Sequence, residues 1–395
     1  MSKTKTILFV ALPYSVHTAR WLAQLNGLGY DLHLFPSIVT PIHLKITDVT
    51  VHYLWHEQRL SQSCPHKKNL SYWLERAINM VLRRGFSQLL LAWRAKQLAK
   101  LIQRIQPDVI HSLEIQAAGY LTLSAKDYLT STFPPWIVTN WGSDIFLFGK
   151  LPKHQEKIRQ VLALCDYYSC ECERDVQLAK QFGFNKIVLP VFPNTGGFDL
   201  SRLANNAHAQ LTSERKVIML KGYQHWAGRA LVALEALTQC VDILQGYTVV
   251  IYSASAVVIK AAVLFTEKTG IVHVCVPQET AHDDILSLHA KARLSIGLSI
   301  SDGISTSLLE AMVMGSFPIQ SCTACADEWI EHGVSGMIVP AEQPEIVAMM
   351  IRKALTDDEL VNRAAQINWQ TALARLNHKD LTQKTLAIYD TLVKR

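Results

Sequence analysis

The chain has 395 residues, a length that favours two domains over one hydrophobic core. Hydrophobic residues make up 49% of it and charged residues 18%, which excludes a disordered or low-complexity chain. The net charge of +6 is mild and gives no reason to expect nucleic acid as a partner.

The N-terminus, Met1–Leu12, has the basic start and apolar run of a signal peptide, but the run is short and ends at Pro13 without a small-residue cleavage site. It also fits a first buried strand. No segment is long and apolar enough to predict a transmembrane helix. Eight cysteines without a disulfide-type pattern favour free thiols in a reducing compartment, so a cytoplasmic protein is expected. The Cys170/Cys172 and Cys322/Cys325 motifs lack partner pairs at zinc spacing, and no metal site is predicted from them.

Short apolar segments alternate with helical ones, which is typical of parallel α/β units. The strands expected in the first half are Thr6–Leu12, Asp31–Phe35, Val49–Leu54, Val109–Ser112, Trp136–Thr139, Tyr167–Ser169 and Ile187–Leu189. The main helices expected between them are Val16–Leu28, Leu89–Gln106 and Glu173–Phe182.

A stretch rich in Asn, Gly and Ser runs from Pro193 to about Ser213, and this composition is typical of a linker. A second series of strands follows it, at Lys216–Leu220, Thr248–Ser253, Ile271–Val276, Arg293–Gly297, Phe317–Ile319 and Gly336–Val339. The last stretch, Asp357–Arg395, is expected to be helical throughout.

The most informative stretch is Ser301–Ile319, in which seven residues separate Asp302 from Glu310. The first carboxylate suits the hydroxyls of a sugar. The backbone amides of Gly303, Ile304, Ser305 and Thr306, at the start of a predicted helix, suit a phosphate. The second carboxylate, Glu310, suits a ribose diol. The alternative is an ordinary helix cap, with Ser305 or Thr306 as N-cap and Glu310 solvated.

This stretch resembles the Asp/Glu-x7-Glu signature of retaining GT-B glycosyltransferases of family 4 (glycosyl transferases group 1). Glu331–Pro340 resembles the segment that closes the donor pocket in that family. The resemblance implies an α/β protein of the GT-B fold, with two Rossmann-like domains facing a cleft and a C-terminal helix that crosses back to the first domain. The expected divisions are an acceptor-binding domain at 1–200, a linker at 201–213, a nucleotide-sugar domain at 214–375 and the returning helix at 376–395.

Lys221, Gly222 and Arg229 follow the first strand of the second domain. The family usually places Gly-Arg and a later Lys in this loop, and this chain departs from that spacing. Two cations beside a leaving diphosphate would stabilise its developing charge; the alternative is a pair of solvated surface charges. By resemblance, the loop at Val276–Ala281 contacts the nucleobase, mainly through backbone groups; a purely connecting loop is the alternative.

In the first domain, Val138–Asp144 resembles the family's Thr-x-His-Gly-x-Asp loop. Trp141 stands where the family has its histidine, and Asn140 or a backbone carbonyl is the expected substitute catalytic group. Gly142 and Asp144 match the pattern, although Asp144 also fits a helix cap before Ile145–Phe148.

Other residues are expected beside these loops. Ser15, His17 and Thr18, after the first strand, are expected to line the acceptor cleft, with a capping or packing role for His17 as the alternative. Glu328 matches a family Glu, and it also fits a surface position.

The segment 64–106 carries nine Lys/Arg residues against a single acid, Glu75, with aromatic residues interleaved. Such a segment suits the inner membrane surface or an acidic lipid-linked acceptor; a helix pair with a solvated basic face is the alternative.

No Asp-x-Asp, P-loop or Gly-x-Gly-x-x-Gly motif occurs, so neither a metal nor a bound cofactor is expected. The resemblance implies retaining transfer of a hexose-type sugar from a nucleotide diphosphate sugar, UDP- or GDP-linked, to a glycan or lipid-linked acceptor, in surface polysaccharide or glycolipid synthesis. Two rivals remain open. One is a sugar-nucleotide epimerase, for which acid/base groups on both faces of the sugar are not found. The other is a catalytically weak GT-B scaffold that binds a glycan or partner.

Overall fold

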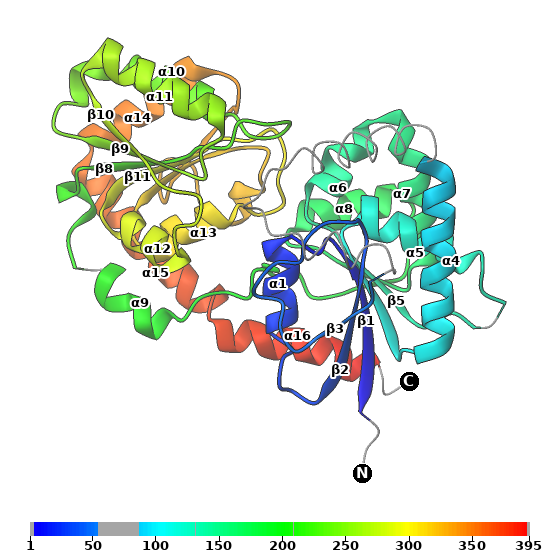
Figure 1. Ribbon diagram of the computed structural model, residues 1–395. Helices are drawn as coiled ribbons and strands as arrows, with labels where there is room; N and C mark the ends of the chain where they lie inside the picture. The colour runs from blue at the N-terminus through cyan, green and yellow to red at the C-terminus, as the bar shows by residue number, and fades with distance from the viewer. Residues whose placement is uncertain (1–3, 54–86, 131, 208, 393–395) are drawn as a thin grey trace. The chain divides into compact units, whose positions relative to one another are not determined.

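The structure, a computed structural model, describes residues 4–53, 87–130, 132–207 and 209–392. It contains two sheets, all of whose paired strands run parallel, with helices packed against them (Figure 1). The chain divides into two compact units. The first comprises 1–170, 175–196 and 382–395, and the second 171–174 and 197–381. The predicted α/β fold with two parallel sheets is thereby confirmed.

The first unit has a seven-stranded sheet of order β3-β2-β1-β4-β5-β6-β7. Its strands are β1 (Lys5–Ala11), β2 (Tyr30–Pro36), β3 (Thr50–Val51), β4 (Val109–Leu113), β5 (Trp136–Thr139), β6 (Tyr167–Ser169) and β7 (Ile187–Val188). The helices are α1 (Val16–Ala23), α4 (Ser87–Ile105), α5 (Tyr120–Lys126), α6 (Ser143–Phe146), α7 (Pro152–Leu164) and α8 (Glu173–Gln181), with a π-helix at Ile115–Gly119.

Side-chain alternation along the strands gives this sheet two different faces. Leu8 and Val10 of β1 and Ile110 of β4 lie in a core shared with α4, α5 and α7. On the other face, His111 of β4 contacts Tyr389, which belongs to the last helix, α16 (His378–Leu392). The part of α16 from Thr382 onward therefore packs with the first unit.

The second unit has a six-stranded sheet of order β10-β9-β8-β11-β12-β13. Its strands are β8 (Val217–Lys221), β9 (Thr248–Tyr252), β10 (Val272–Cys275), β11 (Ala292–Gly297), β12 (Phe317–Ser321) and β13 (Met337–Val339). The helices are α9 (Leu200–Ala207), α10 (Ala230–Thr238), α11 (Ala256–Thr269), α12 (His282–Ala290), α13 (Thr306–Val313), α14 (Pro344–Thr356) and α15 (Asp358–Arg375).

Several predicted boundaries differ from the structure. Residues 200–207 of the predicted linker form α9, because Leu200, Leu203 and Ala207 are buried in the core of the second unit. The units divide at Gly196–Gly197, before the predicted boundary at residue 200. Helix α1 ends at Ala23 instead of Leu28, and the glycines that follow it at 27 and 29 both have positive φ.

The C-terminal stretch is also not helical throughout. It breaks between α15 and α16, where Phe198 donates its N–H to the carbonyl of Leu376 and accepts one from His378. Gly197 has φ +71°, and a Cβ there would lie 2.5 Å from the Leu376 carbonyl oxygen, so the close approach requires glycine. A contact with a distant segment thus ends the helix.

Candidate functional site

The loop after β11 in the second unit leads into the N-terminus of α13. Ser305 is the N-cap residue, with φ −69° and ψ 119°, but its side chain accepts no hydrogen bond from a backbone N–H of the helix. Its hydroxyl instead lies 2.7 Å from Ser307 Oγ and 3.4 Å from Lys221 Nζ. The first N–H groups of a helix have no acceptor within the helix, so an uncapped end beside a lysine suits a phosphate.

Asp302 precedes this helix in a braced turn. Its Oδ1 accepts from the N–H of Gly303 at 3.0 Å, and its carbonyl accepts from Arg174 Nη2 at 2.7 Å. Gly303 and Ile304 are buried, whereas Asp302 and Thr306 are partly exposed. The turn therefore leaves the Asp302 carboxylate partly open to solvent at the start of the helix.

Glu310 lies on α13 and is only 5% exposed, so the alternative of a solvated carboxylate is wrong. Its Oε1 lies 2.8 Å from His282 Nε2, and its Oε2 lies 3.6 Å from His289 Nε2. Burial alone would raise the pKa of Glu310, but the two histidines outweigh it and lower that pKa to about 2. The carboxylate is therefore anionic at neutral pH.

The loop after β8 brings its cations to the same end of the sheet. Lys221 Nζ lies 4.9 Å from the centre of the Tyr223 ring, in addition to its contact with Ser305. At Gly222, a Cβ would lie 2.6 Å from Ala254 Cα, so no other residue fits there. Arg229 Nε lies 2.7 Å from Glu342 Oε1, and the Arg229 side chain is only 18% exposed. Neither cation is a freely solvated surface charge.

His225, in the same loop, was not predicted as a site residue. Burial, and then the charges of Lys221 and Arg229, lower the pKa of His225, while Asp302 acts to raise it. The four groups are therefore close enough to interact electrostatically. The position of His225 between Gly222 and Gly228, inside the predicted phosphate loop, was the available signal.

Glu328 was expected either to correspond to a family Glu or to be a surface residue. Its two oxygens accept hydrogen bonds from the backbone N–H groups of Glu173 and Arg174, at 2.9 and 3.0 Å. These residues belong to the segment 171–174, which groups with the second unit. The structure thus shows Glu328 holding the segment whose Arg174 contacts the Asp302 carbonyl.

One cysteine from each predicted motif meets the other in the second unit. Cys172 Sγ and Cys325 Sγ lie 2.6 Å apart, and both residues are buried. Among the described residues, no cysteine forms a disulfide.

In the first unit, the turn after β1 meets the loop after β5. Ser15 caps α1 and accepts the N–H of His17 at 3.2 Å, while Thr18 is fully buried. The His17 ring packs on Trp141, with ring centres 5.3 Å apart. The structure therefore brings His17 and Trp141 together and gives Ser15 a capping role.

The remaining residues of the β5 loop are engaged internally. Asn140 is fully buried, donates to Asp175 Oδ2 at 2.8 Å and accepts from the N–H of Gly142 at 3.1 Å. Asp144 Oδ2 accepts from the N–H groups of Ile115 and Trp141, at 3.0 and 3.3 Å. Asp144 therefore joins two loops instead of capping the helix in which it lies.

Glu114, at the end of β4, was also missed. It has φ +85° and ψ 155°, a conformation that residues other than glycine rarely adopt, and its carboxylate accepts from the N–H groups of Ala117 and Ala118. Burial, together with the nearby Asp144, raises the pKa of Glu114 to about 8. Its backbone strain had no signal in the sequence.

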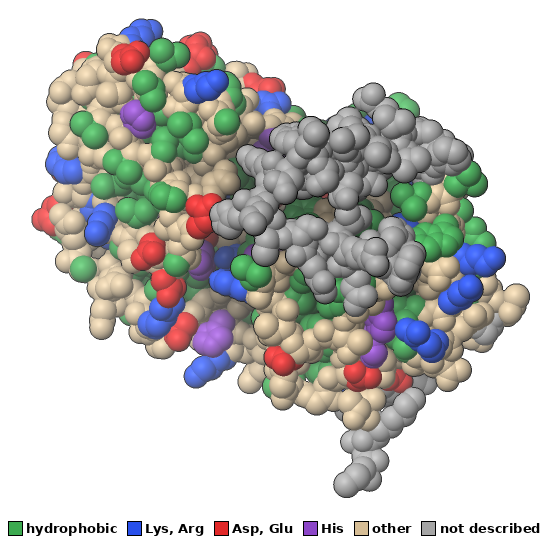
Figure 2. Space-filling model, viewed as in Figure 1, with side chains coloured by type: hydrophobic (Ala, Val, Ile, Leu, Met, Phe, Trp, Pro, Cys, Tyr) green, Lys and Arg blue, Asp and Glu red, His purple; other side chains and the backbone are tan. Residues whose placement is uncertain are grey.

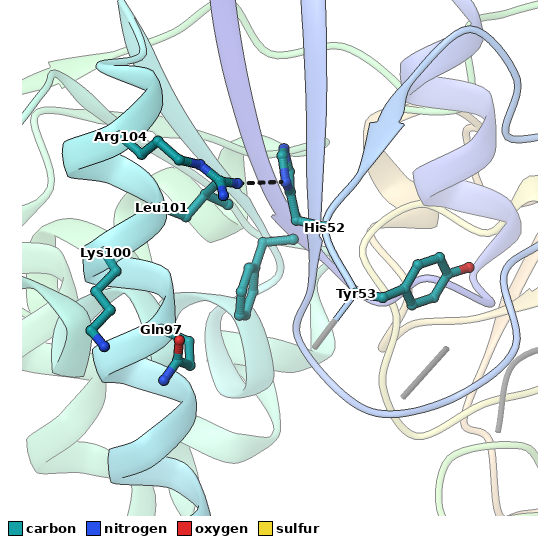
Figure 3. Close-up of a pocket in the computed structure, with 7 residues that line it drawn as sticks. His52, Tyr53, Gln97, Lys100, Leu101 and Arg104 are labelled. Carbon is teal, nitrogen blue, oxygen red and sulfur yellow. Dashed lines mark hydrogen bonds between the residues drawn. The ribbon is translucent and has the colours of Figure 1, made fainter. Parts of the chain in front are cut away.

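The first part of the predicted basic segment, 64–86, lies outside the described residues. In its second part, Lys100 and Arg104 of α4 line a cavity of about 350 Å³ (Figure 3). Arg104 Nη2 lies 3.5 Å from Nδ1 of His52, which also lines the cavity. The remaining lining residues are Phe35, Tyr53, Gln97 and Leu101.

The outer surface of α4 is basic in its C-terminal half. Lys96, Lys100 and Arg104 are exposed, and blue side chains gather over this helix (Figure 2). Arg94 is buried instead, with its guanidinium 5.5 Å from the centre of the Phe35 ring. Among the described residues, no helix is long and apolar enough to cross a membrane.

Two family models match the chain. The one described as "Glycosyl transferase 4-like" matches residues 6–165, and "Glycosyl transferases group 1" matches residues 258–369. No curated protein sequence matches the chain.

Solved structures resemble the chain over almost its whole length. A glycosyltransferase from Rickettsia africae covers 100% of both chains, with a TM-score of 0.66 at 15% identity. HepE from Anabaena, in complex with UDP-glucose, covers 98% of this chain and 99% of its own, with a TM-score of 0.66 at 15% identity. Sucrose-phosphate synthase from Thermosynechococcus elongatus covers the same shares, with a TM-score of 0.71 at 13% identity.

The two parallel sheets and the matched segments define a glycosyltransferase of the GT-B fold. The chain belongs to the glycosyl transferases group 1 family.

Proposed function

We propose that this glycosyltransferase moves a hexose-type sugar from a UDP- or GDP-linked donor to a glycan or lipid-linked acceptor, with retained anomeric configuration and without a metal ion. The observation that carries the proposal is the arrangement around α13: an open carboxylate at Asp302, an uncapped helix end beside Lys221, and a buried anionic carboxylate at Glu310. This order matches the sugar, diphosphate and ribose of a nucleotide sugar.

Each part of the donor has a group suited to it. Asp302 accepts hydrogen bonds from sugar hydroxyls, and the amides of residues 304–306 bind the diphosphate together with Lys221, because the N–H of Gly303 is already donated to Asp302. Arg229 adds positive charge to the same loop, and Glu310 accepts from the ribose diol. The similarity to HepE, a protein whose structure contains UDP-glucose, supports a uridine nucleotide and a hexose.

The chemistry relies on stabilising the leaving group. As the bond between the anomeric carbon and the diphosphate breaks, negative charge grows on the phosphate oxygens, where Lys221 and the helix N-terminus stabilise it electrostatically. This work needs no divalent cation, because fixed positive charge and amide dipoles take its place. In the first unit, Trp141 replaces the family histidine, so no imidazole is available from that position.

The basic face of α4 supports an anionic acceptor. Lys100 and Arg104 border a cavity that also contains Phe35 and Leu101, a combination that suits a phosphate group carried on an apolar body. A lipid-linked acceptor at the cytoplasmic face of a membrane, used in surface polysaccharide or glycolipid synthesis, has this chemistry. The same cations would favour peripheral contact with anionic lipids.

A second candidate is a GT-B protein that binds a glycan or partner with little catalysis. Trp141 and the internally engaged Asn140 favour it, because the loop that carries the family histidine offers no evident acid or base. Donor hydrolysis distinguishes the two candidates, because a scaffold would bind nucleotide without releasing it from its sugar.

The test is the release of nucleotide from UDP-glucose and GDP-mannose, with and without EDTA, by wild type and by Asp302→Asn. The proposal predicts slow hydrolysis of one donor that EDTA does not change and that the variant loses. Tight donor binding without any hydrolysis, even with an acceptor mixture, would favour the scaffold. NMR of the first sugar released identifies its anomeric configuration and tests retention.

A further inference from the structure

Glu310 sits between two histidines of α12 that differ in their freedom to move. His289 is fully buried, whereas the side chain of His282, the first residue of the helix, is 32% exposed. The His282 ring faces Phe198 at a near-parallel angle of 26°, with ring centres 6.3 Å apart. His282 can therefore swing toward solvent, whereas His289 cannot.

A hydroxyl chain fixes the orientation of His289. Its Nδ1 lies 2.8 Å from Ser295 Oγ, which lies 2.6 Å from Ser316 Oγ, and its ring packs against that of Tyr252 in a T-shaped arrangement. With Ser295 donating to Nδ1, the ring carries its proton on Nε2 and points it at Glu310. The opposite tautomer would set a lone pair against a carboxylate, which is repulsive.

That Nε2 atom is nevertheless left without a hydrogen bond among the described residues. It lies 3.6 Å from Glu310 Oε2, beyond normal hydrogen-bonding length. A buried donor without an acceptor is unfavourable, and a small rotation of the carboxylate would satisfy it. A small shift of the Glu310 carboxylate would therefore form a hydrogen bond between His289 Nε2 and Glu310 Oε2.

His282 occupies the other oxygen, Oε1, at 2.8 Å. A buried carboxylate needs a donor on its open side at all times, because an unpaired charge is costly to bury. His282 supplies one N–H to Glu310, whereas a ribose diol supplies two hydroxyls. The diol is thus able to displace the exposed imidazole and leave the buried one in place.

We propose that His289 is a positioning residue that orients Glu310 through Oε2. His282 donates to Oε1 when no donor is bound, and the ribose hydroxyls of the donor displace it. The inference rests on the proposed function, because it takes Glu310 as the ribose-binding group. In the empty site His282 satisfies Glu310. In the loaded site the ribose takes Oε1, and Oε2 closes on His289.

The test measures Kd by calorimetry for UDP and GDP and for their 2′,3′-dideoxy counterparts. His282→Ala should tighten binding of the ribonucleotide roughly tenfold, about the worth of one charge-assisted hydrogen bond, and leave the dideoxynucleotide unchanged. His289→Phe should weaken the ribonucleotide by a similar factor and again leave the dideoxynucleotide unchanged. A general structural defect would affect both ligands alike.

The matched control is His273→Ala, because His273 is a partly buried histidine of the same unit that also contacts a hydroxyl, that of Thr266. It should change neither constant. The inference is overturned if His282→Ala weakens the ribonucleotide, or if neither α12 variant changes the ratio of the two constants. If wild type binds neither UDP nor GDP, the proposed function fails with it. If wild type binds a ribonucleotide and its dideoxy counterpart equally well, Glu310 does not bind the ribose. The inference then fails, although the protein still binds a nucleotide.

Discussion

His111 offers a quantitative test of how α16 packs on the first sheet. It is fully buried, with Nδ1 2.7 Å from the Tyr389 hydroxyl and Nε2 2.6 Å from Thr139 Oγ1. Trp21 donates its indole N–H to the same Tyr389 hydroxyl at 2.8 Å. Burial lowers the pKa of His111 to about 3, so the folded protein holds it neutral.

The sign of the pH dependence follows from this lowered pKa. In the unfolded chain, His111 is protonated below its ordinary pKa of 6.5. In the folded chain it stays neutral until the pH falls to about 3. The stability that His111 contributes is therefore present above pH 6.5 and lost as the pH falls. At pH 5, about 1.5 units below the ordinary value, the loss is about 2 kcal/mol.

The experiment compares wild type with His111→Gln by urea denaturation at pH 7 and pH 5, followed by tryptophan fluorescence. Hydrogen exchange of the peptide that covers β4 assigns the transition to the first unit. The variant starts less stable, but its decrease in unfolding free energy between the two pH values should be about 2 kcal/mol smaller. Equal decreases in both proteins would refute a neutral, buried His111.

The other predictions concern single contacts. Tyr389→Phe should lower the unfolding free energy by about 1–3 kcal/mol in urea titrations, because Trp21 and His111 lose their shared partner; an unchanged midpoint would contradict this. Lys221→Met should weaken UDP binding roughly tenfold in calorimetry, while Lys216→Met, which removes another lysine over a tyrosine ring, should not. Gly222→Ala should abolish donor binding, because its Cβ has no room beside Ala254; a variant with wild-type affinity would show that the loop is not at the donor site.

The strands were largely predictable from the sequence. Buried parallel strands are short, continuous apolar runs between turn residues, and this pattern identified β1, β8 and β11 to within one or two residues. The apolar pattern was less accurate at the predicted strand Val49–Leu54, where only Thr50–Val51 pairs with β2. Strand existence is a local property, whereas pairing length depends on the neighbouring strand.

The interruptions and side-chain partners were not predictable in the same way. The break between α15 and α16 depends on Phe198, which is far away in the sequence. Glu310 was identified by its spacing from Asp302, but its partners His282 and His289 belong to a helix whose sequence carries no sign of that contact. The engagement of Asn140 by Asp175 likewise arises only when β5 and α8 come together.

The central claim is that the second unit binds a nucleotide sugar through Glu310. The most direct test is calorimetric titration of wild type and Glu310→Ala with UDP, GDP, ADP and CMP, with thermal melts to confirm that both proteins are folded. The account predicts that wild type binds one of these nucleotides selectively and that the folded variant loses that binding. A folded wild-type protein that binds none of them, or a variant that binds as tightly as wild type, would contradict it.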